Sequence, residues 1–277
     1  MLASVLPPDI IHLNHCCVGF EQQDNRIEIY FKNREAVLSD LLIGADGTNS
    51  VVRQTLISDS LPNYANRMSW RAVIQYNHDL LSPNASTLIT APDGKNFLLI
   101  DVGEGYTFWS AGALSADDFV HQSATNPKIR VLERFANWAE PVEAIVEATP
   151  VDAIVERPIY DLTPLDSWSK GKVTLLGDAA HAVVPSLGQG ANMAFEDAYQ
   201  LAECLKASPD NIETALHAYE NSRIPRTKVI YERSAFEGNR SYQPDSEVTL
   251  REMVKPSQMK QDEFEAWLYD YKPSVNR

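Results

Sequence analysis

Alternating apolar and polar positions mark the first strands of the chain. Ile27 and Ile29 fall on one side of the segment Arg26–Phe31, which predicts a half-buried strand. The turn-forming pair Asp24-Asn25 precedes this segment, so residues Val18–Gln22 are predicted to be its hairpin partner.

Two continuous apolar runs, Leu41–Ala45 and Val173–Leu176, predict short strands that are buried on both faces. An aspartate beside a glycine ends each run, Asp46-Gly47 after the first and Gly177-Asp178 after the second. The shared composition predicts that the two runs are neighbours in one sheet, with both aspartates at the same edge. A short helix, Ser50–Leu56, is expected after the first run.

The residue pattern changes between residues 61 and 165, where strand-like runs are separated by Gly, Pro, Asn and Asp. This pattern predicts a mostly antiparallel sheet, inserted as a second domain between two pieces of the first. The expected strands are Ala72–Tyr76, Ser86–Thr90, Phe97–Val102, Tyr106–Ala111 and Ile154–Tyr160. The expected helices are Lys128–Trp138 and Val142–Ala148.

Helical periodicity dominates the last third of the chain. Apolar residues spaced by three and four predict a helix over Gln189–Leu205, and a longer helix is expected over Ile212–Arg233. The tail, Gln258–Arg277, carries an apolar stripe and is expected to pack back onto the body rather than bind a partner. The stripe consists of Phe264, Trp267, Leu268 and Tyr271.

Charge and cysteine content narrow the function classes. The 277 residues carry a net charge of −14, which disfavours nucleic acid and anionic lipid as partners. Cys16, Cys17 and Cys204 form no framework spacing, so free thiols in a reducing, cytoplasmic setting are expected. No stretch approaches the ~20 apolar residues of a membrane span, and no metal site is expected.

Residues 177–197 form the strongest candidate site. A buried strand delivers Asp178 at its carboxyl end, where open α/β sheets bind ligands, and this carboxylate could accept hydrogen bonds from sugar-type hydroxyls. Glycines let the backbone approach a ligand, and the following helix start offers N–H groups to an anion. The alternative is a tight turn with a capping Asp. Three glycines with Pro185 and Asn192 exceed what such a turn needs, which favours ligand binding.

Residues 44–53, Gly-Ala-Asp-Gly-Thr-Asn-Ser-Val-Val-Arg, form a second candidate. Asp46-Gly47 alone is a turn signal. Its position after a buried strand, with Ser50 and Arg53 on the next helical turn, is more specific. Asp46 or Ser50 could equally be a plain helix cap.

Together the two motifs resemble those of FAD-dependent aromatic-type monooxygenases. The Gly-Ala-Asp-Gly-x-x-Ser-x-x-Arg run looks like the second nucleotide-contact motif of these flavoprotein hydroxylases. The Gly-Asp-Ala-Ala-His…Pro-x-x-Gly-Gln-Gly-Ala-Asn run looks like their riboflavin-side motif. Trp168–Leu176 and Tyr219–Arg226 match as well, and the resemblance, to the branch of salicylate hydroxylase, urate hydroxylase and zeaxanthin epoxidase, extends from about Val5 to Tyr231.

The resemblance implies an enzyme that holds FAD, takes NAD(P)H as co-substrate and acts with O2 on a small apolar or aromatic molecule. It implies that Asp178 contacts the ribityl and pyrophosphate region of FAD. It places Arg71 on the substrate side as the catalytic-site residue, where a surface arginine is an equal interpretation, and gives His181 a structural role. The other implied cofactor contacts are Asp46, Gly47, Arg53, Gly177, Pro185, Gly188, Gln189, Gly190, Ala191 and Asn192.

The implied fold is a mixed α/β flavoprotein-hydroxylase fold, with a truncated FAD-binding parallel sheet and an inserted antiparallel substrate sheet. Residues 1–60 and 166–235 would form the FAD-binding domain, 61–165 the substrate domain and 236–277 a tail. The family begins with a strand, a Gly-x-Gly-x-x-Gly loop and a helix, and these residues contain no such run. The nearest match, Gly103-Glu104-Gly105, is predicted to be a strand-end turn.

The missing loop leads to further expectations. The chain alone should bind FAD weakly or not at all and expose an apolar patch beside Leu41–Ala45. It should therefore self-associate or pair with a chain that supplies the segment. Two other functions stay open: a descendant that binds, isomerises or cyclises a ligand without flavin, and a non-enzymatic remnant that pairs with a relative. Intact flavin-side motifs favour the monooxygenase.

Overall fold

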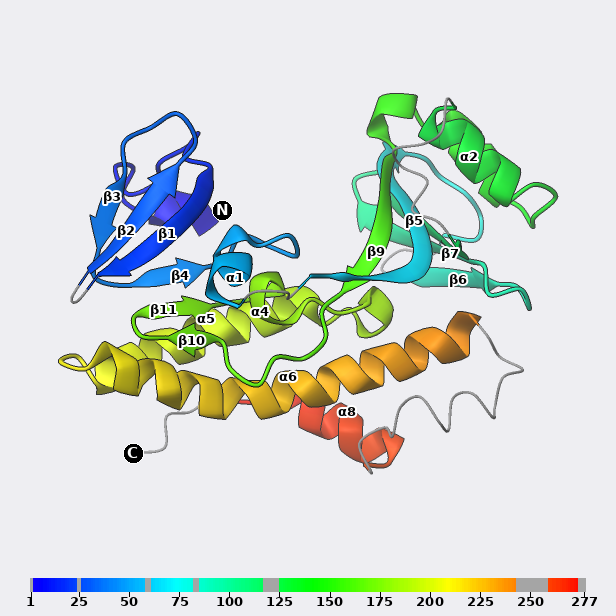
Figure 1. Cartoon of the computed structure of the whole chain (residues 1–277). Coiled ribbons are helices and arrows are strands. Elements are labelled where there is room, and N and C mark those ends of the chain that lie inside the picture. The colour runs from blue at the N-terminus through cyan, green and yellow to red at the C-terminus, as the bar shows by residue number, and fades with distance from the viewer. Residues whose placement is uncertain are drawn as a thin grey trace.

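The computed structural model describes residues 2–23, 26–57, 61–81, 85–116, 125–242 and 259–273. The fold is mixed α/β, as predicted. In Figure 1 two sheets stand apart above the long helix α6 (Ile212–Tyr242), which runs beneath both. The three cysteines are free thiols, as expected.

The first sheet is antiparallel, with the order β1-β2-β3. Its strands are β1 (Cys17–Gln23), β2 (Arg26–Phe31) and β3 (Val37–Ser39). β1 and β2 form the predicted hairpin, and Ile27 and Ile29 are buried on the predicted face. The predicted turn at Asp24-Asn25 lies outside the described residues. The sequence does not predict β3, because three residues are too few to show a period of two.

The second sheet brings the two candidate motifs together. It has the order β10-β11-β4, built from β10 (Ser169–Lys170), β11 (Val173–Leu175) and β4 (Leu42–Gly44). β11 and β4 pair in parallel, with Val173 opposite Leu42, which confirms that the two apolar runs are neighbours. The expectation that both are buried on both faces is wrong for β4. It is the edge strand, and Ile43 is 39% exposed.

The third sheet is antiparallel, with the order β6-β7-β8-β5-β9. Its strands are β5 (Asn63–Gln75), β6 (Ser86–Thr90), β7 (Asn96–Gly103), β8 (Tyr106–Leu114) and β9 (Val155–Asp161). β5 begins well before the expected start at Ala72. Its first half carries several polar residues and a β-bulge between Tyr64 and Met68, which hide the alternation in the sequence. Gly103 and Gly105 have positive φ in the connection from β7 to β8, which confirms the strand-end turn.

The two faces of the third sheet differ. Met68, Trp70 and Ala72 of β5 are buried in an aromatic core with residues from the neighbouring strands. Helices α2 (Pro127–Arg134) and α3 (Val142–Ala148), with the 3-10 turn η3 (Val151–Ala153), complete this region. Because side chains alternate along a strand, the intervening residues of β5 point to the opposite face.

The remaining helices connect or cover these sheets. They are η1 (Leu2–Val5), α1 (Val51–Leu56), α4 (Asp178–His181), η4 (Pro185–Leu187), α5 (Gly190–Ala207) and α8 (Gln261–Tyr269). Phe264 and Leu268 of α8 are buried against Met193 and Ile230, so the tail packs on the body as predicted. None of the helices in the described ranges is long and apolar enough to cross a membrane.

Two larger cores underlie this arrangement. One draws on residues 68–154, and the other joins residues 17–57 to residues 165–224. The second core holds together the segments that carry the two motifs. The division into domains stays a prediction.

Candidate functional site

Arg53 ties the two motifs together. Its side chain is completely buried. Nη1 donates to the carbonyl of Ala179 at 3.0 Å, and Nη2 donates to the carbonyl of Thr48 at 2.6 Å. Arg53 therefore fixes the loop after β4 against α4, and it supports the site through other residues rather than by facing it.

Asp46 caps helix α1. Its carboxylate accepts hydrogen bonds from the hydroxyl of Ser50 at 2.5 Å, from the N–H of Val51 at 2.7 Å and from the N–H of Val52 at 3.2 Å. These bonds satisfy donors that the helix start leaves open. Ser50 is the N-cap residue, and its hydroxyl accepts from the N–H of Arg53 at 2.8 Å, so both residues make capping contacts. A contact of Asp46 with a cofactor stays a prediction. Gly47 adopts a φ of +80° beside it, with open space where a Cβ would lie.

The start of α5 forms a cradle beside Asp178. Gly188 has a left-handed φ of +63°, and α5 begins at Gly190 with no side chain capping it. A Cβ on Gly190 would lie 3.9 Å from Oδ1 of Asp178. Asp178 is exposed, and no described residue forms a hydrogen bond or ion pair with it. A free carboxylate and uncapped N–H groups thus lie side by side.

The other predicted residues of this loop shape the cradle. Gln189 is buried and donates to the carbonyl of Leu187 at 3.3 Å, while its side-chain oxygen accepts from Asn192 at 3.2 Å. Pro185 opens η4, and Ala191 lies exposed in the first turn of α5. Both amide side chains are therefore oriented before any ligand arrives.

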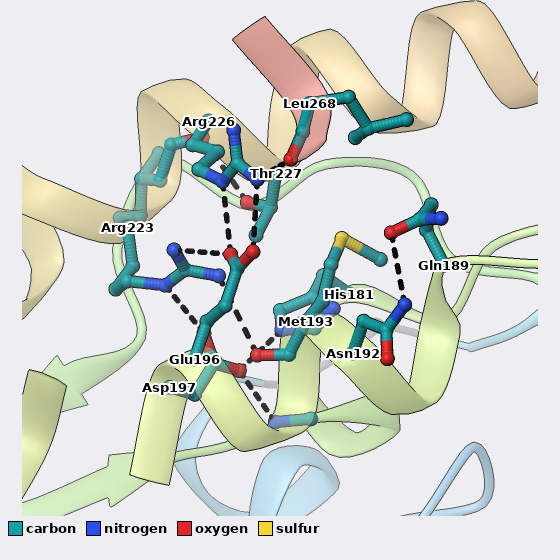
Figure 2. A network of polar contacts seen from close by, with 12 residues as sticks. His181, Gln189, Asn192, Met193, Glu196, Asp197, Arg223, Arg226, Thr227 and Leu268 are labelled. Carbon is teal, nitrogen blue, oxygen red and sulfur yellow. Dashed lines mark hydrogen bonds and ion pairs between the residues drawn. The ribbon is translucent and has the colours of Figure 1, made fainter. Parts of the chain in front are cut away.

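A buried ionic network lies behind the cradle (Figure 2). The carboxylate of Asp197 accepts from the N–H of Gly177 at 3.0 Å and from Nε of Arg223 at 2.7 Å, and it lies 2.6 Å from Nε2 of His181. Burial raises the pKa of Asp197, but the hydrogen bond and charge of His181, together with Arg223, hold the pKa below its ordinary value. His181 is thus a structural member of the motif.

The network continues into the tail. Glu196 pairs with Nη1 of Arg223 at 2.8 Å, and its two carboxylate oxygens accept from Nε and Nη2 of Arg226, each at 2.8 Å. Arg226 also donates to the carbonyl of Leu268 at 3.0 Å and lies 3.7 Å from the ring centre of Tyr271. The sequence shows these residues only as motif matches. The sequence feature that could have revealed this network is the pair Glu196-Asp197 on one predicted helix, followed by Arg223 and Arg226 on the next.

A cavity of about 810 Å³ lies between the outward face of the third sheet and η4. It reaches Pro185 and Ser186, and Arg71 lines it as expected. The sequence leads us to expect a largely apolar pocket with few polar groups. The lining surface is mostly apolar, as expected, but about half of the lining side chains are polar, which is more than predicted. The lining comprises Arg67, Ser69, Arg71, Leu88, Thr90, Ala91, Pro92, Asn96, Leu98, Phe108, Ser110, Gly112, Ile159, Pro185 and Ser186.

The chemistry of the cradle suits a ligand with hydroxyls and anionic or carbonyl oxygens. Asp178 can accept from hydroxyls, and the N–H groups at the start of an 18-residue helix favour negative charge. Bare glycines leave room for a planar ring close to the backbone. Within the described ranges, no group of His, Cys, Asp and Glu has the arrangement of a metal site.

Comparison with known proteins agrees with this chemistry. The family model described as "FAD binding domain" matches residues 10–234. The chain is 33% identical over 227 residues to the aurachin C monooxygenase/isomerase of Stigmatella aurantiaca, covering 82% of this chain and 58% of that protein. It is 35% identical over 247 residues to the chloroplastic zeaxanthin epoxidase of Solanum lycopersicum, covering 83% of this chain and 36% of that protein.

Solved structures share the fold. Klebsiella pneumoniae HpxO complexed with FAD and uric acid superposes with a TM-score of 0.80 at 25% identity, covering 91% of this chain and 64% of that one. A salicylate hydroxylase substrate complex superposes with a TM-score of 0.74 at 22% identity, covering 98% and 71%. The chain thus spans 36% to 71% of the length of these four relatives.

Proposed function

Because the chain belongs to the FAD-binding monooxygenase family, we propose that it forms the flavin-side part of an FAD-dependent monooxygenase. The reaction would use NAD(P)H and O2 to hydroxylate or epoxidise a small molecule. One observation carries this proposal. The unpartnered carboxylate of Asp178 stands beside the uncapped start of α5, and the adjoining η4 borders a cavity of about 810 Å³.

The residues present fit the flavin half of FAD. Asp178 would accept hydrogen bonds from the ribityl hydroxyls, and the backbone of Gly188, Gly190, Ala191 and Asn192 would border the ring. Bound FAD would supply the redox chemistry and the activation of O2. The chain's own part is to orient the ring, present substrate from the cavity through Arg71, and limit the access of water.

A flavin-free ligand-binding role is the second candidate. The cavity lining comes entirely from residues between Arg67 and Ser186. A small molecule could therefore bind there whether or not the cofactor does. An isomerase or cyclase of the same fold would use the cavity in that way.

Exposed apolar residues support the proposal that further polypeptide completes the flavin site. Phe195 and Tyr199 on α5 are 61% and 54% exposed, and among the described residues no strand pairs with the outer edge of β4. Such surfaces are usually covered in a monomeric soluble protein. We propose that a strand–loop–helix unit with a Gly-x-Gly-x-x-Gly loop covers them, and that it comes from the same polypeptide or a separate chain.

The test is a titration of FAD into the purified 277-residue chain, followed by quenching of flavin fluorescence. We expect weak quenching by the chain alone and clear saturation when a glycine-rich strand–loop–helix unit from a relative is fused to its N-terminus. Fusion of the same unit with its three glycines changed to valine is the control, because it keeps the added mass and removes the phosphate-binding loop. Tight stoichiometric binding by the unfused chain would show that other residues hold the cofactor, and no binding by either fusion would contradict the flavoprotein proposal.

A further inference from the structure

Trp168 and His181 each carry a buried polar atom that the rest of the site does not use. Nε1 of Trp168 and Nδ1 of His181 are out of contact with solvent, and neither has a hydrogen-bond partner among the described residues. Trp168 is 1% exposed and His181 is 4% exposed. A buried donor or acceptor without a partner costs free energy, so such groups in proteins nearly always bind another group or a water molecule.

The two rings are neighbours, and both are held in place. Their centres are 5.2 Å apart. The ring of Trp168 also packs on that of Tyr219, with the centres 5.5 Å apart, and its backbone N–H donates to Glu220 of α6. His181 is held through Nε2 by Asp197. Because neither ring can turn away without breaking these contacts, a partner for the two remaining nitrogens has to fit between fixed groups.

A small cavity with a volume of about 10 Å³ adjoins both residues. It lies among residues of the segment 162–168, the end of α4 and one side of α6. A cavity of this size has room for about one water molecule and is too small for an organic ligand. Thr227 of α6 lines it as well. The hydroxyl of Thr227 donates to the carbonyl of Ile224 at 3.1 Å, and its oxygen can still accept a hydrogen bond.

We propose that this cavity binds one structural water molecule, which bridges Trp168 to His181. The indole N–H can only donate, so the water oxygen accepts from Trp168. The water donates one proton to Nδ1 of His181 and the other to Oγ1 of Thr227. These are about the three hydrogen bonds that a buried water usually makes. Water suits the site better than an ion, because this set of partners requires both an acceptor and a donor.

The bridging water fixes the tautomer of His181. When Nδ1 accepts from the water, the neutral ring carries its proton on Nε2 and donates it to Asp197. Both ring nitrogens are then occupied, so neither is free to act as a base. His181 ends the one-turn helix α4, and Asp178 begins it. The water therefore helps to hold the turn that presents Asp178, whether or not flavin binds.

A crystal structure of the 277-residue chain, at a resolution that shows ordered water, tests the site directly. We expect a water peak within about 3.2 Å of both Nε1 of Trp168 and Nδ1 of His181. The absence of such a peak, or a protein atom bound to either nitrogen, would overturn the proposal. Crystals soaked in sodium bromide distinguish water from an anion, because an anomalous bromide signal at this position would show that the site selects negative charge instead.

Nuclear magnetic resonance of histidine labelled with 15N in the ring tests the tautomer in solution, at about pH 8 where unperturbed histidine is neutral. The ring signals of His181 are assigned through its backbone resonances. We expect a proton on Nε2 and, at Nδ1, the chemical shift of a nitrogen that accepts a hydrogen bond. A proton on Nδ1, or the shift of an unbonded Nδ1, would contradict the proposal even if no variant could be purified.

Trp168→Phe should move the Nδ1 signal of His181, because the water loses the donor that holds it. Trp109→Phe is the matched control. It removes an equally buried indole N–H, but one that donates directly to Thr149 at 2.9 Å in the other large core, and it should leave the Nδ1 signal unchanged. Thermal unfolding shows whether each variant is folded. An Nδ1 signal that is the same in the wild type and in folded Trp168→Phe would overturn the bridge.

Discussion

Oδ2 of Asp197 lies 2.6 Å from Nε2 of His181, out of contact with solvent. The same carboxylate holds the backbone N–H of Gly177 and the guanidinium of Arg223. One buried charge therefore fixes the end of β11, the α4 turn and the two long helices relative to each other. These contacts therefore set the shape of the cradle beside Asp178.

Replacing Asp197 with Asn should destabilise the chain by about 3 kcal/mol, because it leaves buried donors and the charge of Arg223 poorly matched. The free energy of unfolding in urea measures the loss. Asp166→Asn is the matched control, since it breaks an exposed pair with Lys228 and should leave the free energy nearly unchanged. Similar losses in the two variants would show that the buried network stabilises the fold no more than an exposed ion pair does.

The same carboxylate predicts a dependence of stability on pH. The pKa of Asp197 lies below its ordinary value of 3.8, because His181 and Arg223 outweigh the effect of burial. A lowered folded pKa gives a stabilisation that is full above about pH 4 and is lost as pH falls through the folded pKa. The difference in urea midpoint between the wild type and Asp197→Asn should therefore be constant above about pH 5 and narrow as the pH falls below about 4. A constant difference would contradict the assignment.

Asp178 should matter for flavin and not for folding. Its carboxylate is exposed and has no partner among the described residues. Asp178→Ala should leave the unfolding midpoint unchanged and weaken flavin binding by the fused chain roughly tenfold, as expected for a lost charge-assisted hydrogen bond. Asp210→Ala, at another exposed aspartate, is the control. A loss of stability without a loss of affinity would assign Asp178 to the turn alone.

Arg226 should hold the tail on the body. It joins Glu196 to the carbonyl groups of Trp267 and Leu268. Arg226→Gln should raise amide hydrogen exchange in α8 roughly tenfold, since local opening then costs less free energy. Arg134→Gln removes one side chain–carbonyl bond at the end of α2 and should not alter exchange in α8. Unchanged exchange in the Arg226 variant would mean that Phe264 and Leu268 suffice to dock the tail.

The exposed side of α5 should drive self-association of the unfused chain. Phe195 and Tyr199 are one turn apart on this side. The double change to serine should shift sedimentation velocity toward the monomer, because it removes apolar surface. Tyr269→Ser, at a tyrosine that is 69% exposed on α8, should leave association as it was. A monomeric wild type would contradict the expectation.

Segments with their own periodicity could be predicted from the sequence. β6 and α3 have the predicted bounds, and the parallel pairing of β4 with β11 follows from two similar apolar runs with similar ends. The length of β5 could not be predicted in this way. Its first half carries Arg67 and Ser69 on the outward face, and polar outward residues resemble a loop until the cavity they line is known.

The contacts of the site were less accessible to sequence reasoning. The capping contacts of Asp46 were one of two open interpretations, and only the geometry of α1 shows that they form. The hydrogen bond between Asp197 and Arg223 joins residues 26 positions apart on different helices. No local period encodes such a contact. The number of polar side chains in the cavity was underpredicted for the same reason, because the register between strands brings them together.

The alternation along β5 also limits how this protein can change in evolution. Met68 and Trp70 serve the core, while Ser69 and Arg71 between them line the cavity. Inserting or deleting one residue here would exchange the two sets and place arginine in the core. New ligand preferences can therefore arise by point substitution at every second position of this strand, whereas changes in its length are expected to be eliminated by selection.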